Sequence, residues 1–164
     1  MAEGVRSWST TAATNASADS TINWAENQLP GTVNNSARAL MAQIKRWCSD
    51  NDGSLTSGGS SNAYTLTYAV APAAYYTPMR FTFKTSFAVT GAATVNVNTL
   101  GAKTIKKLVS GTKTDLASGD IASGDYIDLV YDGTDMVWVN KGQATTPANA
   151  SESVAGIVEL ATVA

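Results

Sequence analysis

The sequence predicts a mainly β protein with an N-terminal amphipathic helix, in which the β part forms a small antiparallel β-sandwich or barrel. Three observations support this prediction. Apolar residues recur with a helical period between residues 32 and 49, and apolar and polar residues alternate through much of region 63–141. Turn signals that contain glycine separate the alternating runs, as is typical of compact antiparallel β domains.

The composition excludes several classes of function. The chain has 164 residues, with 11 basic and 13 acidic side chains, one cysteine and no histidine. A net charge of −2 gives no basic footprint for nucleic acid. Zinc sites that need histidine or several cysteines, and histidine-based catalytic triads, are impossible within this chain. No apolar run approaches the ~20 residues of a membrane-spanning helix, so we predict no membrane insertion.

Shifts in composition divide the chain into five segments. In order, we interpret them as an extended docking segment, a loop with the amphipathic helix, a Gly/Ser linker, the β domain, and a second linker with an apolar end (1–22, 23–52, 53–62, 63–141 and 142–164). The apolar end has too little chain around it to form a core, which indicates pairing with another chain or a continuation beyond Ala164.

Segment 1–22 is rich in Ala, Ser, Thr and Asn, and Trp8 is its main bulky side chain. Such a segment buries too little apolar surface to offset the entropy of its own ordering. It is either a flexible tail or a segment that becomes ordered on a partner. In the second case Trp8 is the expected anchor, because Trp is enriched among interface hot spots.

The helix follows a loop in which Trp24 is an aromatic plug. We expect Thr32 or Asn34 to cap its first turn and the Asn-Asp-Gly cluster at 51–53 to end it. Its apolar stripe has steps of 4, 3, 4 and 3, the a/d pattern of a heptad: Val33, Ala37, Leu40, Ile44 and Trp47. A single helix of this length is marginal in water, so something must cover the stripe. The cover is either the β domain of the same chain or, as we favour, other copies or a docking partner.

The β region shows alternation in several short runs, at 64–68, 81–84, 95–98 and 127–131, followed by a last run at 136–140. The strongest turn signal is Asp132-Gly133, because both residues tolerate the positive φ of a hairpin turn. About six short strands with regular turns favour a sandwich or barrel.

Motifs that carry chemistry are scarce. The sequence has no P-loop, no Gly-x-Ser-x-Gly and no Cys-x-x-Cys. We expect the aspartates of the β region to serve turns, with a calcium site or a glycosidase pair as the alternatives: Asp115, Asp120, Asp125, Asp128, Asp132 and Asp135. Cys48 is expected to be a small buried apolar group rather than a nucleophile. The basic run is expected to be a solvated or edge-protecting strand rather than a phosphate site: Lys103, Lys106 and Lys107. We therefore predict no enzyme, no cofactor and no metal site.

Three aromatic residues of the β region leave a sugar-binding alternative open. If Tyr75, Tyr76 and Trp138 are exposed, their rings can stack on sugars, which would make the chain a sugar-binding or host-surface adhesin module. The adjacent tyrosines, close to Pro72 and Pro78, are equally compatible with a loop plug, which we favour. A polysaccharide-degrading enzyme would require residues beyond Ala164.

A resemblance to a known family rests on three stretches. Residues 22–47, INWAENQLPGTVNNSARALMAQIKRW, resemble the NWAEG…P…VNDSAR…M…W segment near the N-terminus of many tailed-bacteriophage tail-fibre proteins. Residues 91–98 and 101–105, GAATVNVN and GAKTI, resemble the β module that follows in those fibres, and residues 150–162, ASESVAGIVELAT, resemble the start of their shaft. Asn27 and Asn35 stand where that pattern has Gly and Asp, and the second change removes a carboxylate from the first turn of the helix.

The resemblance implies a structural component of the virion, made in the host cytoplasm. Such a fibre is a homotrimer whose N-terminal part attaches to the phage tail or baseplate, and whose distal parts, not evident in this chain, recognise a host surface glycan. We predict that the contact residues are the stripe and the two N-terminal tryptophans, with Trp8 docking onto the tail: Trp8, Trp24, Val33, Ala37, Leu40, Ile44 and Trp47.

Overall fold

The structure, a computed structural model, describes residues 4–141 of the chain. The predicted second linker and shaft start, 142–164, lies outside the described residues. The described part is mainly β with one α-helix, in this order: η1 Ala12–Asn15, α1 Pro30–Asn51, β1 Gly58–Ser60, β2 Ala63–Leu66, β3 Arg80–Lys84, β4 Ala93–Val97, β5 Ala102–Val109, β6 Thr112–Asp115, β7 Tyr126–Tyr131 and β8 Met136–Trp138. The mainly β class with an N-terminal helix is therefore confirmed.

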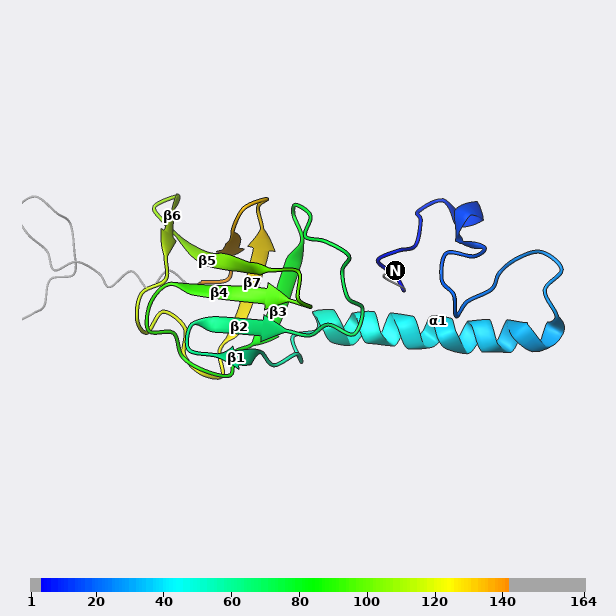
Figure 1. Cartoon of the computed structure of the whole chain (residues 1–164), viewed down its shortest axis with the longest axis horizontal. Helices are drawn as coiled ribbons and strands as arrows, with labels where there is room; N and C mark the ends of the chain where they lie inside the picture. The colour runs from blue at the N-terminus through cyan, green and yellow to red at the C-terminus, as the bar shows by residue number, and fades with distance from the viewer. Residues whose placement is uncertain (1–3, 142–164) are drawn as a thin grey trace, which may run out of the picture.

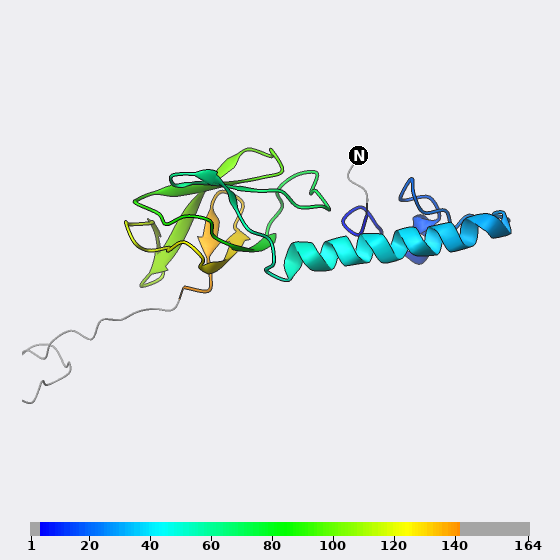
Figure 2. The ribbon, with the colours of Figure 1, turned by 90° about the horizontal axis from the view of Figure 1, so that it is seen from below.

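The molecule is elongated, with a β domain at one end and α1 projecting from it as a rod (Figure 1). A helix of this length extends over about 33 Å. The C-terminal end of α1 meets the β domain and its N-terminal end lies far from it (Figures 1 and 2). Most of α1 therefore has no strand beside it.

The β domain is one curled sheet with the strand order β1-β2-β4-β5-β8-β7-β3, and β6 pairs with β5. The expectation of a purely antiparallel arrangement is wrong, because β2 pairs with β4 and β5 pairs with β8 in parallel. Between the parallel strands β2 and β4, the chain forms β3 at the other end of the strand order and then returns. Parallel neighbours need such long connections, whereas the turn signals in the sequence specify only hairpins.

The two ends of the strand order approach each other just before β1. The N–H of Ser57 donates to the carbonyl of Lys84 at 2.8 Å, and the N–H of Lys84 donates to the carbonyl of Leu55 at 2.7 Å. Since Lys84 is the last residue of β3, this bridge curls the sheet into a half-barrel. Segment 53–62, expected as a Gly/Ser linker, thus contains this bridge and strand β1.

The core fills the inside of the curled sheet. The alternating residues of the sequence occupy it as predicted, since each of four strands sends every second side chain inward: Tyr64 and Leu66, Phe81 and Phe83, Val95 and Val97, Ile127 and Leu129. The Asp132-Gly133 hairpin is also confirmed, because β7 and β8 pair antiparallel across it. The N–H of Asp132 donates to the carbonyl of Asp135, and Gly133 has a φ of 107°.

The N-terminal segment runs beside α1 on one side of the rod (Figures 1 and 2). Ile22 is buried at only 4% exposure, and the backbone N–H of Asn23 donates to the hydroxyl of Ser36 on α1. Segment 1–22, expected as an extended docking segment, is therefore placed from residue 4 onward against the helix of its own chain. No α-helix in the described range combines the length and apolar character needed to cross a membrane.

Candidate functional site

Helix α1 begins at least three residues earlier than the sequence predicts. Leu29 occupies the N-cap position with extended backbone, and Pro30 is the first helical residue. Proline suits this position because its fixed φ is helical and it has no N–H to leave unpaired. The expected side-chain cap from Thr32 or Asn34 is wrong: both residues lie inside the helix, and the Thr32 hydroxyl donates to the carbonyl of Leu29.

One face of α1 is buried, and its buried side chains are polar. They repeat every seven residues, at Ser36, Gln43 and Asp50, each at most 5% exposed. Ser36 bonds the backbone of Asn23, and Gln43 donates to the carboxylate of Asp19 at 3.3 Å. We call these three residues the polar line. It attaches the helix to the N-terminal segment and, through Asp50, to the β domain.

Asp50 makes the joint between helix and β domain. Its two carboxylate oxygens accept hydrogen bonds from the backbone N–H groups of Ala69 and Val70, at 2.8 and 2.7 Å. Arg6 reaches the same loop, because its Nε donates to the carbonyl of Val70 at 3.2 Å. The N-terminal segment, the last turn of α1 and the loop after β2 therefore meet at one point.

The predicted apolar stripe lies beside the polar line and is only partly covered. At about 100° per residue, the stripe and the polar line are centred about 80° apart around the helix. Val33 is 43% exposed, Ile44 44% and Trp47 43%, whereas Ala37 and Leu40 are half-buried. Met41, at the edge of the stripe, is 71% exposed. The intramolecular contacts of α1 thus use mainly its polar line and leave most of the apolar stripe open to solvent.

Asp19 organises the N-terminal segment on the helix. Besides Gln43, its carboxylate accepts hydrogen bonds from the N–H of Gly4, from the N–H and the hydroxyl of Thr21, and from the side chain of Trp8. Burial raises the pKa of this carboxyl, but the hydrogen bonds from Thr21, Gly4 and Trp8 outweigh it and leave the pKa below its ordinary value of 3.8. Asp19 is therefore an ionised, buried group at neutral pH.

A small pocket opens between this segment and the helix. It has a volume of about 130 Å³ and combines three of the predicted contact residues with three further ones: Trp8, Trp24 and Leu40 with Asn15, Asp19 and Ile22. Leu40 belongs both to this pocket and to the apolar stripe, so the two features are continuous. The structure thus brings Trp8, Trp24 and Leu40 together on one side of the helix, next to Val33, Ala37, Ile44 and Trp47.

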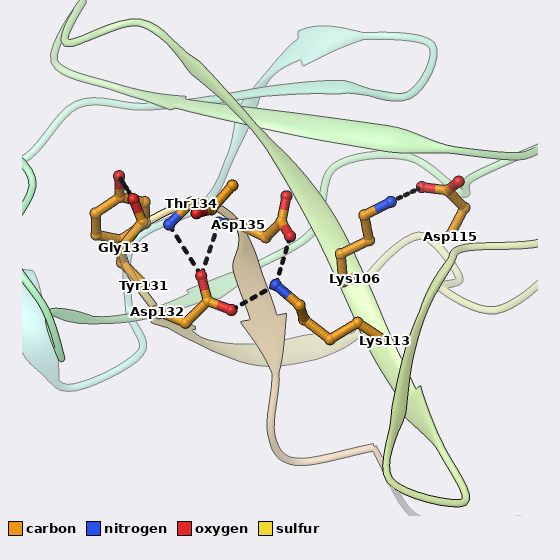
Figure 3. A network of polar contacts seen from close by, with 8 residues as sticks. All are labelled: Lys106, Lys113, Asp115, Tyr131, Asp132, Gly133, Thr134 and Asp135. Carbon is orange, nitrogen blue, oxygen red and sulfur yellow. Dashed lines mark hydrogen bonds and ion pairs between the residues drawn. The ribbon is translucent and has the colours of Figure 1, made fainter.

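The aspartates of the β domain are engaged in turns and ion pairs. Lys113 of β6 donates to both Asp132 and Asp135 in the turn between β7 and β8, at 2.8 and 2.7 Å (Figure 3). Hydrogen bonds from Lys113 and from the backbone N–H groups of Asp135 and Thr134 lower the pKa of Asp132 to about 2. Within residues 4–141, no group of three or more potential ligands is arranged to bind a metal ion.

Two further aspartates have cationic partners. Asp120 accepts hydrogen bonds from Lys107 at 2.5 Å and from Lys141 at 2.7 Å. Asp128 lies on β7, not in a turn, and forms a bidentate pair with Arg80 of β3. The lysines of β5 do not protect an edge, because β5 lies inside the sheet between β4 and β8.

Two of the three rings proposed for sugar stacking are engaged or buried within the β domain. The Tyr75 hydroxyl donates to the carbonyl of Gly101 and accepts from the N–H of Val97, and Lys103 lies 5.6 Å from the ring centroid of Tyr75. Trp138 is only 8% exposed, so it does not meet the condition that the sugar-binding alternative sets. Tyr76, at 58% exposure, is the exposed member of the trio. The loop-plug interpretation therefore describes Tyr75 better than a sugar platform does.

Cys48 corrects another expectation. It is exposed, not buried, because it lies on the far side of the apolar stripe from the polar line and nothing in the described chain covers that side.

No protein-family model matches the chain, and no curated protein matches it.

The contacts that sequence reasoning missed are the buried Ile22 and four polar residues: Asp19, Ser36, Gln43 and Asp50. A signal for three of them exists, since Ser36, Gln43 and Asp50 repeat every seven residues directly beside the stripe. Polar residues at helical spacing ordinarily form a solvated face, so the spacing alone does not indicate burial.

Proposed function

We propose that this chain is a non-catalytic structural component of a tailed-bacteriophage virion, a homotrimeric tail-fibre protein. In this proposal its helix brings three copies together, and its N-terminal region attaches the fibre to the tail or baseplate. The observation that carries the proposal is the exposed apolar stripe on a helix whose polar line is already engaged within the chain. The resemblance of residues 22–47 to the attachment segment of tail-fibre proteins supplies the biological setting.

The spacing of the stripe supports association through helices. Val33, Leu40 and Trp47 occupy alternate core positions of a heptad, and Ala37 and Ile44 occupy the positions between them. A continuous apolar face of this kind on a soluble protein marks an interaction surface. Association of copies removes the three most exposed side chains of the stripe from water without breaking any contact of the polar line.

The projection of α1 away from the β domain also supports the proposal. Because the strands lie beside only the C-terminal end of the helix, copies can approach the stripe along most of its length (Figures 1 and 2). The half-barrel domains are then carried together at one end of the bundle when the helices run parallel. The chemistry of the described residues favours a structural role, since their aspartates are already engaged with lysines, Arg80 or backbone N–H groups.

A paired substitution tests the trimer. Val33→Asp with Ile44→Asp places two charges on side chains that are more than two-fifths exposed in the single chain, so the fold itself should survive. The matched control, Asn35→Asp with Ala42→Asp, adds the same charge on exposed positions away from the stripe.

We expect sedimentation equilibrium to give three chain masses for the unmodified protein and for the control, and one chain mass for the stripe variant. A stripe variant that stays trimeric contradicts the proposed interface. Attachment is tested separately by loading the purified protein onto phage particles that lack fibres. Trp8→Ala should reduce the loaded amount, and undiminished loading contradicts the role of Trp8.

A further inference from the structure

The pocket beside Leu40 is a distinct feature of the described surface. Its volume of about 130 Å³ is close to that of engineered cavities that accept one six-membered ring, so it has room for a single side chain. A second and wider hollow of about 420 Å³ adjoins it and shares Asn15 and Trp24 with it. Its other lining residues are Ala12, Ala13, Ala16 and Glu26.

The polar groups around the small pocket are already used. The amide of Asn15 accepts from the N–H of Ser9 at 2.7 Å and donates to the carbonyl of Ser9 at 2.8 Å. The Asp19 carboxylate accepts four hydrogen bonds from Gly4, Thr21 and Gln43, and a further one from the side chain of Trp8. A sugar, whose hydroxyl oxygens also accept hydrogen bonds, therefore finds few free donors here.

What the pocket does offer is aromatic surface and negative charge. Two indoles line it, together with the ionised Asp19, and Glu26 lines the adjoining hollow. Neither lining contains a lysine or an arginine. Indole is the aromatic group that attracts cations most strongly, and the attraction increases when the cation is partly removed from water.

We propose that this pocket binds the side chain of an arginine or lysine on a partner protein, with Trp8 and Trp24 contacting the cation and Asp19 and Glu26 supplying the opposite charge. Charge complementarity selects this occupant over an apolar side chain. The inference deepens the attachment role proposed above and rests on it for the source of the partner. The binding chemistry itself does not depend on a trimer.

The test is a titration of the full, ¹⁵N-labelled chain, monitored through the indole N–H signals of its tryptophans. The probe is the blocked peptide acetyl-Gly-Arg-Gly-amide, with acetyl-Gly-Lys-Gly-amide as a second cation. Acetyl-Gly-Leu-Gly-amide and methyl glucoside are the apolar and sugar comparisons. We expect the two cationic peptides to shift the Trp8 and Trp24 signals with millimolar affinity, and salt to weaken this binding because it screens the charges.

Matched variants assign the binding to the pocket. Trp24→Leu keeps an apolar side chain and should weaken arginine-peptide binding by about fivefold, corresponding to a cation–π contribution of about 1 kcal/mol. Glu26→Gln should weaken it less, since Glu26 lines only the adjoining hollow. Tyr76→Leu, which changes an exposed aromatic ring outside both the pocket and the stripe, should leave the affinity unchanged.

Three results overturn the inference: no shift with either cationic peptide, equal shifts with the leucine peptide, or shifts with methyl glucoside instead. Repeating the titration with Val33→Asp/Ile44→Asp separates the two proposals. If the unmodified chain is monomeric and still binds the arginine peptide, the trimer is contradicted and the pocket is supported. If the chain is trimeric and neither it nor the variant binds the peptide, the trimer is supported and the pocket is contradicted. Binding by this variant that the unmodified trimer lacks assigns the occupant to a second copy, whose side chain blocks the pocket in the trimer, and overturns the foreign partner.

Discussion

The Oδ2 atom of Asp50 accepts a hydrogen bond from the backbone N–H of Val70 at 2.7 Å, which joins the last turn of α1 to the β domain. Oδ1 does the same for Ala69. A buried carboxylate that receives two backbone donors fixes the direction in which the helix leaves the domain. The proposed bundle depends on this joint, because it sets how α1 and its open stripe are oriented relative to the β domain.

We expect Asp50→Ala to lower the free energy of unfolding by about 2–3 kcal/mol, since it leaves two backbone N–H groups without their charged acceptor. Urea denaturation monitored by tryptophan fluorescence measures the change. Asp52→Ala is the control, because Asp52 is exposed and its carboxylate accepts a hydrogen bond from the backbone N–H of the nearby Ser54. Equal losses in the two variants would contradict the role given to Asp50.

Asp19→Ala should release the N-terminal segment from the helix while the β domain stays folded. Five donor groups lose their acceptor at once, including the N–H groups of Gly4 and Thr21. Hydrogen exchange of these two amides should accelerate by about tenfold or more, whereas exchange of the β2 and β4 amides should not change. Unchanged protection at Gly4 and Thr21 would show that the segment is held by other contacts.

Gly59→Ala should destabilise the β1–β2 hairpin by about 1–3 kcal/mol. Gly59 has a φ of 94°, and an added Cβ would lie 2.0 Å from the carbonyl oxygen of Ala63, so both the backbone conformation and the available space require glycine. Gly91→Ala is the matched control, because an added Cβ there meets nothing within 4 Å. Thermal melting of the two variants should separate them clearly, and a Gly59→Ala protein as stable as the Gly91→Ala protein contradicts the observed conformation of Gly59.

The stability of the β domain should fall between about pH 4 and about pH 2 through Asp120. Burial raises the pKa of Asp120, but hydrogen bonds from Lys107, Lys141 and the N–H of Ala117 outweigh it and lower the pKa to about 2. A pKa lower in the folded than in the unfolded chain gives stability that is fully present above the unfolded value near 4. This stability is lost as the pH falls through the folded value.

The contribution of Asp120 to the free energy of unfolding is roughly 2 kcal/mol at neutral pH. Asp120→Asn should remove it at pH 7 and flatten this part of the acid-unfolding curve. Asp115→Asn is the control, because the pair of Asp115 and Lys106 is more exposed and contributes less than about 1 kcal/mol. An Asp120→Asn protein with an unchanged acid-unfolding curve would contradict the assignment.

The strands were predictable where the information is local. Alternation at Tyr64 and Leu66, or at Phe81 and Phe83, follows from burial of one face of a strand, and the Asp132-Gly133 turn follows from local backbone preference. Strand β1 was not predictable, since Gly58 and Gly59 have low β propensity and pair because their partners in β2 position them. The parallel pairs depend on which distant strands meet, and periodicity does not contain that information.

The candidate site was predictable in its apolar half only. The spacing of Val33, Leu40 and Ile44 is a local pattern and gives the stripe directly. The return of the N-terminal segment to the helix depends on Asp19, one acidic residue among many small polar ones, whose partners come from distant parts of the chain. Trp8 and Trp24 were therefore identified as contact residues without the pocket that they form together.

The central claim is that other copies of this chain cover the apolar stripe of α1. Sedimentation equilibrium of the full chain over a wide concentration range tests it most directly. We predict a mass three times the 17.0 kDa of one chain, decreasing toward one chain only on strong dilution. A mass of one chain at every concentration, with Val33, Ile44 and Trp47 still accessible to solvent, would contradict the account.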